Sequence, residues 1–554
     1  MVKLNRYIFI LMLLISSNLL FAQDSLKTNV FNVDKVLKPI LSESMKIQSN
    51  PNPEVPEIKT PVFEYANIPD TIHKATSTIY TIKPLSMGTS LLPKLKNNYT
   101  KFGYGNLNTP LFEVYLNTVR NKEWQAGFFA KHLSSHPSDD NIFKGTNTFS
   151  DNIVEGFAKK FSSTSVLDLD VNYYRKNLYL FGSSNPADLI SLTGNPEIQQ
   201  LFQTIEAKGS FSNIVKDSVS MLYKIGAGFY NFSDSHGISE NDFKVFGDFK
   251  KLIDNNPLEV KTQLNITDVK NSTTDYQRVY FDLNPRYTLK IDALYLRLGF
   301  NSTIYSDSTS SNLFFFPVAE AGYSLITKSL IGYAGITGDV KRNTYRSIIN
   351  QNPFVRDPLF NNTVNNFELY GGFKGKLGSQ TSFSLQASWK SVQNQLFYAV
   401  DSAKYNSQMV YYDTKSISIA NIKGEISHEF GDQFRMSLTA NYYSYSTTFL
   451  HPYALPTFET KLNLMYNIGD KFILKADIFT MNQRYALVKG TTNSNTDVIL
   501  NGLVDLNAGI DYRYSKTVSV FLNLNNLTNN MYQRWYTTYP SYGFNLIGGL
   551  AVTF

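Results

Sequence analysis

The sequence predicts a transmembrane antiparallel β-barrel of about 22 strands, with short periplasmic turns and long extracellular loops. Three observations lead to this fold class. Aromatic residues make up 14% of the 554 residues, yet the mean hydropathy is slightly negative, at −0.22. Strand-length segments alternate apolar and polar residues from residue 94 to residue 554, and short turns alternate with longer connections. In strands with one face in lipid and the other in water, apolar and polar residues offset each other, so the mean hydropathy lies near zero.

The amino terminus has the features of a secretory signal over residues 1–22. "MVKLNRYIFILMLLISSNLLFAQDS" has a basic start, an apolar middle and a small-residue exit. We expect cleavage after Ala22, so that the mature chain begins at Gln23. The alternative is a membrane anchor, but the apolar run from Tyr7 to Ala22 is short against the roughly 20 residues of a spanning helix. Without cysteine, the chain has no disulfide, thiol nucleophile or lipid anchor on cysteine.

Residues 23–93 are predicted to form an extended periplasmic or lumenal segment. "PNPEVPEIKTP" at 51–61 is a proline-rich, charged linker. The more apolar stretch at 29–47 suits either an extended strip that binds a partner or one short helix broken near Pro39. A segment of this length with so much proline would form a poor core. We therefore expect a docking or lumenal segment, not an independent domain.

The barrel is expected to span residues 94–554, and its strands are counted from their connections. Short turns are centred on 120–123, 162–165, 215–218, 254–257, 290–293, 327–329, 378–380, 431–433, 469–471 and 514–516. Longer polar connections lie near 107–110, 134–150, 178–199, 231–239, 268–276, 304–312, 340–365, 396–411, 444–455, 486–497 and 528–541. These connections join about 22 strands, and they place both ends of the barrel on the side of the short turns.

The alternation within strands indicates a sheet with one face in lipid, and such a sheet must close. In "FRMSLTANY", Phe434, Met436 and Leu438 share one face, and Arg435 and Ser437 share the other. Every backbone group must be paired in lipid, so a sheet that crosses a membrane must form a cylinder. The final strand, which ends "GGLAVTF", is expected to pair with the first, near "YTKFGYGNL". A soluble propeller or solenoid would show a regular blade period, and none is present.

The carboxyl-terminal stretch "VFLNLNNLTNNMYQRWYTTYPSYGFNLIGGLAVTF" resembles the end of TonB-dependent receptors. The matching residues are Asn525, Asn526, Leu527, Thr528, Asn529, Tyr532, Gly543 and Phe554. The stretches 102–117, 131–136 and 365–378 resemble a Bacteroidota subfamily of these barrels that lacks an obvious plug domain. The receptors themselves carry a folded plug of over a hundred residues, and residues 23–93 are too few for one and show no plug-like strand pattern.

The resemblance implies a place in the cell outer membrane, in contact with its lipid. It also implies that the barrel assembly machinery recognises the aromatic terminus, here Phe554 with Val552 and Leu550 on the lipid face. TonB is a candidate partner, and "TNVFNV" at 28–33 is the candidate segment for binding it. The alternative interpretation of that segment is a strip that binds a periplasmic or lipoprotein partner.

The remaining chemistry does not indicate an enzyme. The formal charge of +7 is spread along the chain without a basic block, so no nucleic-acid partner is predicted. His132 and His136, near Asp139 and Asp140, are the densest group, but residues four apart on a strand are about 13 Å apart, too far to share a metal ion. Loop acids such as Asp307 lack a regular calcium-ligand spacing. We predict no catalytic, cofactor or metal site.

Aromatic residues in the last long connection are the candidate ligand contacts. "NNMYQRWYTTYPSY" at 529–542 contains Trp535, Tyr536 and Tyr539, whose rings suit sugars or other amphipathic ligands in an outer loop. The alternative is an interfacial girdle, because these residues flank the last strand.

Two functional hypotheses follow from this fold. The first is a transport barrel that passes or captures a solute across the outer membrane. The alternative is a plugless structural subunit of an outer-membrane complex, which docks partners through residues 23–93. In both, a lumen of 22 strands is too wide for wall side chains to fill. The amino-terminal segment, inward loops or a partner must therefore occupy it.

Overall fold

The computed structural model describes residues 98–554 except 119–120, 138–147, 180–197, 215–219, 272–274, 308–309, 328, 357–359, 402–406, 414, 432, 490–494 and 538. The chain divides into two units, Met1–Ser90 and Leu91–Phe554, and all described residues belong to the second. The predicted signal with Ala22 and Gln23, the segment 23–93 and the candidate TonB-binding stretch at 28–33 lie outside the described residues.

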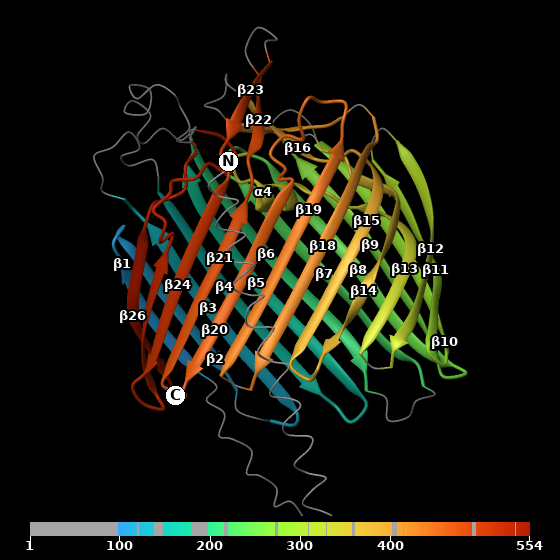
Figure 1. Ribbon diagram of the computed structural model, residues 1–554, viewed down its shortest axis with the longest axis horizontal. Helices are drawn as coiled ribbons and strands as arrows, with labels where there is room; N and C mark the ends of the chain where they lie inside the picture. Colours follow the sequence, from blue (N-terminus) through green and yellow to red (C-terminus); the bar gives the residue numbers. More distant parts are fainter. Residues whose placement is uncertain are drawn as a thin grey trace, which may run out of the picture. The chain divides into compact units, whose positions relative to one another are not determined.

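Twenty-two strands form one antiparallel sheet that closes into a barrel (Figure 1). Each wall strand pairs with the next along the chain, and the last pairs with the first from Tyr99 opposite Thr553 to Gly105 opposite Ile547. This confirms the predicted fold class, strand number and closing pair. The wall strands are β1 (Tyr99–Gly105), β2 (Thr109–Asn117), β3 (Trp124–Ser135), β4 (Phe149–Phe161), β5 (Ser165–Tyr179), β6 (Gln199–Asn213), β7 (Leu222–Asp234), β8 (Ser239–Ile253), β9 (Asn256–Lys270), β10 (Asp275–Ile291), β11 (Leu294–Ser306), β12 (Ser311–Ile326), β13 (Leu330–Lys341), β14 (Thr363–Leu377), β15 (Thr381–Gln393), β18 (Ile417–Phe430), β19 (Phe434–Ser446), β20 (Phe458–Ile468), β21 (Phe472–Met481), β24 (Leu503–Arg513), β25 (Val518–Asn525) and β26 (Asn545–Thr553).

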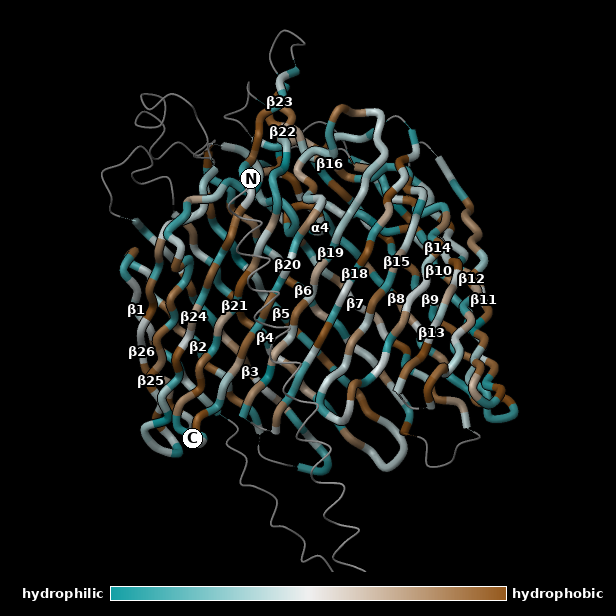
Figure 2. The backbone as a smooth tube through the Cα atoms, viewed as in Figure 1, coloured by the Kyte–Doolittle hydropathy of each residue, from teal (hydrophilic) through white to brown (hydrophobic). Residues whose placement is uncertain are grey.

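The wall strands present apolar side chains outward and polar side chains to the lumen. In β5, Leu167 and Leu169 are each 50% exposed on the outside. Asp168, between them, forms ion pairs with Lys159 and Lys224 on the opposite face. Figure 2 shows the resulting alternation of apolar and polar residues along the strands. A closed sheet with this apolar exterior is the architecture of an outer-membrane β-barrel.

The single helix among the described residues is too short to cross a membrane.

Nine of the ten predicted short turns include described residues, and their positions at one end of the barrel are confirmed. The tenth, at 215–218, lies outside the described residues. Asp254 and Asn255, between β8 and β9, have φ values of 49° and 65°, as the favoured two-residue hairpin turn requires. Phe554 exchanges backbone hydrogen bonds with Asn98 at this same end, so the last strand ends beside the turns (Figure 1). By the rule for outer-membrane barrels, this end is periplasmic.

The prediction of long connections at the other end is correct in position but wrong in length for three of them. Strands β7 and β8, β9 and β10, and β11 and β12 are joined by 235–238, 271–274 and 307–310. The strands continue into residues that the sequence analysis assigned to loops. Asn231 of β7, for example, donates to Asn241 of β8 at 2.8 Å. Polar side chains are tolerated there because the strands extend beyond the apolar band.

The seam between β1 and β26 is built around two opposed glycines. Gly103 lies directly opposite Gly549, and the ring of Phe521 packs against both from β25. On the outer face, Leu550 and Phe554 are 52% and 59% exposed, and Val552 is 38% exposed. The three residues of the predicted assembly signal therefore face outward, beside the closing strand. Their recognition by the assembly machinery stays a prediction.

Three of the longer connections contain regular structure. Helix α4 (Tyr345–Gln351) lies between β13 and β14, and the hairpin β16 (Phe397–Asp401) and β17 (Ser407–Tyr411) lies between β15 and β18. The hairpin β22 (Arg484–Lys489) and β23 (Asn495–Leu500) lies between β21 and β24. The two hairpins join into one four-stranded sheet through a parallel pair, β16 with β22. The sequence predicts only polar connections here, so this regular structure was not expected.

Candidate functional site

The long connections pack into one body at the outer end of the barrel, which we call the cap. It comprises 342–362 with α4, 394–416 with β16 and β17, 482–502 with β22 and β23, and the final connection 526–544, except for the undescribed residues among them. Figure 1 shows α4, β16 and β22 together at the end opposite the short turns. The cap is thus made from connections that begin and end on different parts of the wall.

Backbone hydrogen bonds join these connections to each other. Ala399 of β16 pairs with Leu487 of β22 in the parallel ladder. The amide of Gln408 in β17 donates to the carbonyl of Phe354 at 2.8 Å, and the amide of Arg356 donates to the carbonyl of Gln408 at 3.0 Å. The segment that follows α4 therefore extends the cap sheet by one bridge.

Helix α4 begins with a capping box. The Thr344 hydroxyl accepts from the amide of Ser347 at 3.0 Å, and the Ser347 hydroxyl lies 2.9 Å from the amide of Thr344, which donates to it. Tyr345, Ile348 and Ile349 all lie on one buried face, at the spacing of neighbouring helical turns. The first amides, those of Tyr345 and Arg346, donate to the Glu240 carboxylate of β8 at 2.7 Å and 3.2 Å. A wall carboxylate thus satisfies the free amides of the helix start.

Ion pairs hold the same segment to the lumen side of the wall. Arg342 pairs with Asp242 of β8 at 2.6 Å, and Arg346 pairs with Glu206 of β6 at 2.7 Å. Both arginines are largely shielded from solvent, so these pairs are screened less than surface pairs. They fix the direction in which the connection folds, which is inward across the mouth.

Arg278 of β10 binds both ends of the α4 connection. It is 4% exposed. Its Nη1 donates to the carbonyl of Asn343 at 2.7 Å, its Nη2 donates to the Asn362 side chain at 2.7 Å, and its Nε donates to the Tyr305 hydroxyl at 3.1 Å. The guanidinium therefore has a partner at each nitrogen, as a buried charge requires. This makes Arg278 a structural clamp.

An apolar core connects the cap to opposite parts of the wall. Phe202 of β6 and Phe232 of β7 pack with Tyr345 and Ile348 of α4, and the same cluster includes Tyr398 of β16. β6 is the sixth strand in the ring of 22, and the connection that carries β16 leaves the fifteenth. The cluster therefore spans nearly the full width of the mouth. The inward loops that the sequence analysis considered as one filling for the lumen are present at its outer end.

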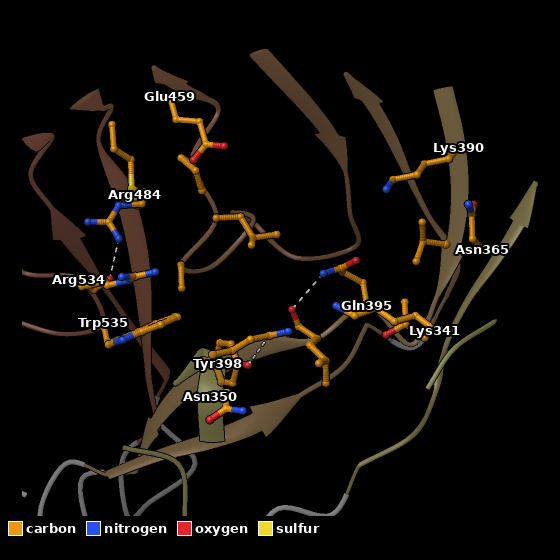
Figure 3. A pocket seen from close by; sticks show the side chains of 18 of the residues that line it. Lys341, Asn350, Asn365, Lys390, Gln395, Tyr398, Glu459, Arg484, Arg534 and Trp535 are labelled. Atoms are coloured by element: carbon orange, nitrogen blue, oxygen red, sulfur yellow. Dashed lines mark hydrogen bonds between the residues drawn. The ribbon is translucent and has the colours of Figure 1, made fainter. Parts of the chain in front are cut away.

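Between the cap and the wall lies a cavity of about 770 Å³ (Figure 3). A cavity of this size suits a small molecule. Its wall side carries Asp339, Lys341, Thr363, Asn365, Glu368, Lys390, Val392, Glu459 and Met481. Its cap side carries Asn350, Gln351, Gln395, Leu396, Tyr398, Arg484, Arg534 and Trp535, and the connection between β19 and β20 adds Ala454, Leu455 and Pro456. The lining is mostly polar and charged, with two aromatic rings.

Arg484 is the most deeply buried charge of this lining. It is 2% exposed, and its Nη1 and Nη2 donate to the carbonyls of Arg534 and Gln533 at 2.6 Å and 2.8 Å. Its Nε has no hydrogen-bond partner among the described residues. Burial and the nearby charge of Arg534 lower the pKa of Arg484 to about 10. The side chain therefore remains a cation at neutral pH.

The three predicted ligand-contacting aromatics occupy different places. Trp535 lines the cavity, where its ring meets Tyr398 edge-on at 5.2 Å. Tyr539 is 4% exposed and stacks on Phe354 at 4.2 Å, and Tyr536 packs in the same small cluster. Tyr539 therefore connects two parts of the cap, while Trp535 can reach a molecule in the cavity. Arg484 was not among the predicted site residues, because it lies in a hairpin whose sequence predicts only a polar connection.

Histidine and carboxylate groups do not gather into a metal site among the described residues. His132 instead uses both ring nitrogens within the wall, next to Asn152 at 2.7 Å and Ser134 at 3.1 Å. The Asp307 carboxylate accepts from the amide of Ser310 at 2.8 Å and from the Tyr305 hydroxyl at 2.7 Å, so it caps its own turn. Asp139 and Asp140 lie outside the described residues.

Solved structures with the same barrel are receptors and transporters. The ferripyoverdine receptor of the outer membrane of Pseudomonas aeruginosa superposes with a TM-score of 0.62 at 12% identity, over 82% of this chain and 71% of that one. The FrpB iron transporter from Neisseria meningitidis gives 0.65 at 10% identity, over 83% and 82%. The siderophore receptor PirA from Acinetobacter baumannii gives 0.62 at 11% identity, over 82% and 80%.

The barrel has the fold of the TonB-dependent receptors. At these identities the likeness is one of fold. No protein-family model and no curated protein matches the sequence. The resemblance noted in the carboxyl-terminal sequence is therefore confirmed at the level of the barrel. The closed barrel and the apolar exterior of its wall place the protein in the outer membrane.

Proposed function

We propose that this protein captures a polar solute of small-molecule size in the capped cavity and passes it across the outer membrane. The observation that carries the proposal is the cavity itself. Charged and amide side chains from four wall strands and four connections converge on a space of about 770 Å³. Convergent polar groups in a concave space of this size favour a binding site over a packing defect.

The cap supplies the second part of the proposal, which is controlled passage. An open barrel of 22 strands would be a wide leak. Here the apolar core and the ion pairs of Arg342 and Arg346 hold the cap across the mouth. A solute in the cavity lies between the cap and the lumen wall. Capture followed by local movement of the cap would admit it without opening the whole barrel.

The structural neighbours agree in kind with uptake. They are a receptor bound to ferripyoverdine, an iron transporter and a siderophore receptor. These ligands belong to those proteins. What supports uptake in this chain is the combination of the barrel, the cap and the polar cavity. No part of the proposal requires a catalytic group.

The proposal is tested by solute depletion in living cells. A strain that makes the protein and a strain that lacks it would be grown in the same defined medium, and the small solutes that remain would be measured by mass spectrometry. We expect at least one polar solute to disappear more slowly without the protein. The control is a strain with the cavity blocked by Gln395→Trp, which should behave like the deletion while the barrel still reaches the outer membrane. Identical depletion in all three strains would contradict uptake.

A further inference from the structure

The two most buried arginines of the cap region differ in how their charges are satisfied. Arg278 has a hydrogen-bond partner at each of its three nitrogens and packs beside the rings of Tyr305 and Phe360. Arg484 is at least as deeply buried, but its Nε has no partner among the described residues. It also forms no ion pair with any described carboxylate, whereas buried charges are normally paired. Arg484 thus lines the cavity without a carboxylate partner among the described residues.

A second cation increases the positive potential at this place. The guanidinium of Arg534 lies 5.4 Å from the ring centre of Trp535, also on the cavity lining. Figure 3 shows Arg484, Arg534 and Trp535 on one side of the cavity, and Lys341, Lys390 and Asn365 on the other. The lysine side is balanced by Asp339 and Glu368 of the same strand group. The excess positive charge is therefore concentrated at the arginine side, where Glu459 is the one carboxylate of the lining.

We propose that Arg484 and Arg534 form an anion subsite that binds a carboxylate or phosphate group of the solute. The proposal rests on the proposed capture function and names its substrate class as an anionic, polar small molecule. Arg484 supplies a fixed positive charge at the cavity lining, and Arg534 supplies the second positive charge and the guanidinium donors for a charge-assisted hydrogen bond. The amides of Gln395 and Asn350 remain for neutral polar groups of the same molecule.

The rival explanation is that Arg484 only fastens the final connection to β22. Its two bonds to the carbonyls of residues 533 and 534 would serve that purpose without any ligand. Arg534 separates the two explanations. Its side chain takes no part in those bonds, because only its backbone carbonyl accepts from Arg484. Arg534→Gln therefore removes a charge from the subsite and leaves the fastening intact.

The test is calorimetric titration of the purified, full-length, folded protein with citrate, with inorganic phosphate and with glucose. We expect citrate or phosphate to bind, and glucose to bind at least tenfold more weakly. Binding of citrate alone identifies a carboxylate subsite, and binding of both identifies a general anion subsite. Arg534→Gln and Arg484→Gln should each weaken anion binding by about tenfold or more, as expected for a lost charge-assisted contact. Arg484→Lys should restore part of the affinity.

The matched control is Lys489→Gln. Lys489 lies on the same cap strand as Arg484, over the ring of Tyr411 at 4.1 Å, and does not line the cavity. Its loss should leave anion binding within about threefold of the original, because exposed or remote charges contribute little. Equal anion affinity in Arg534→Gln and the unmodified protein would overturn the subsite. Absence of binding by both anions to folded protein would also overturn it.

These outcomes are distinguishable from failure of the proposed capture function. If cells deplete only neutral solutes and the purified protein binds no anion, the uptake proposal is supported and the anion subsite is contradicted. If no solute is depleted, the uptake proposal is contradicted, whatever the calorimetric titration shows.

Discussion

Gly549 sits where the barrel seam leaves no space for a side chain. A Cβ there would overlap the carbonyl oxygen of Phe102 in β1 and would lie 2.7 Å from the Phe521 ring. The neighbouring Gly548 points outward, and a Cβ there would meet nothing closer than Leu522 at 3.6 Å, an ordinary contact. Two adjacent glycines therefore have opposite tolerance to the same substitution.

Gly549→Ala should weaken barrel closure, while Gly548→Ala should not. We expect the first to lower the free energy of unfolding by about 1–3 kcal/mol, the usual cost of overpacking, because the backbone of β1 must move. Urea titration of the purified barrel, together with its heat-modifiable mobility on gels, would measure the difference. If the two variants had equal midpoints, the tight approach of β1 and β26 would not be what fixes the seam.

The outward residues of the last strand were predictable, and the seam glycine was not. A period of two in "GGLAVTF" places Leu550, Val552 and Phe554 on one face whatever the partner strand is. The constraint on Gly549 comes from Phe102 and Phe521, which register brings to it from β1 and β25. Nothing in the local sequence carries that information. The same holds for Arg484, whose burial depends on the final connection lying across it.

At the scale of elements, more of the wall than of the cap could be predicted from the sequence. Turn residues and alternation are local signals, so the wall strands and short turns could be placed from them. Helix α4 also had a local signal, since Thr344 and Ser347 flank its first turn and Tyr345, Ile348 and Ile349 follow helical spacing. The pairing of β16 with β22 had none. Its register depends on where the wall strands position the ends of the two connections.

Replacement of residues 345–355 with a Gly-Ser linker of equal length should open the barrel. The linker removes the side chains of α4 from the apolar core and the backbone bridge to Gln408. In planar bilayers we expect the unmodified protein to show little conductance and the replaced protein to show a large, steady one. The double variant Arg342→Leu and Arg346→Leu keeps the core and cuts only the ion pairs, so it should give brief, intermittent openings. A closed channel in the linker variant would mean that the cap does not seal the mouth.

The molecule as a whole has two distinct ends, and its lack of cysteine allows their orientation to be measured directly. Leu450 is 78% exposed in the connection between β19 and β20, and Tyr514 is 71% exposed in the turn between β24 and β25. A membrane-impermeant maleimide should label Leu450→Cys in intact cells. It should label Tyr514→Cys only after the outer membrane is permeabilised. The reverse pattern would place the cap on the periplasmic side and would contradict capture from outside.

The cap has one further consequence, for the kinetics of its opening. Each of its connections is tethered to the wall at both ends, so an element that detaches cannot diffuse away. Its effective local concentration stays in the range of about millimolar, as for any short intramolecular tether. Re-sealing is therefore a first-order event, independent of how many copies of the protein the membrane holds. A barrel closed by its own chain resets after each opening without waiting for another molecule to arrive.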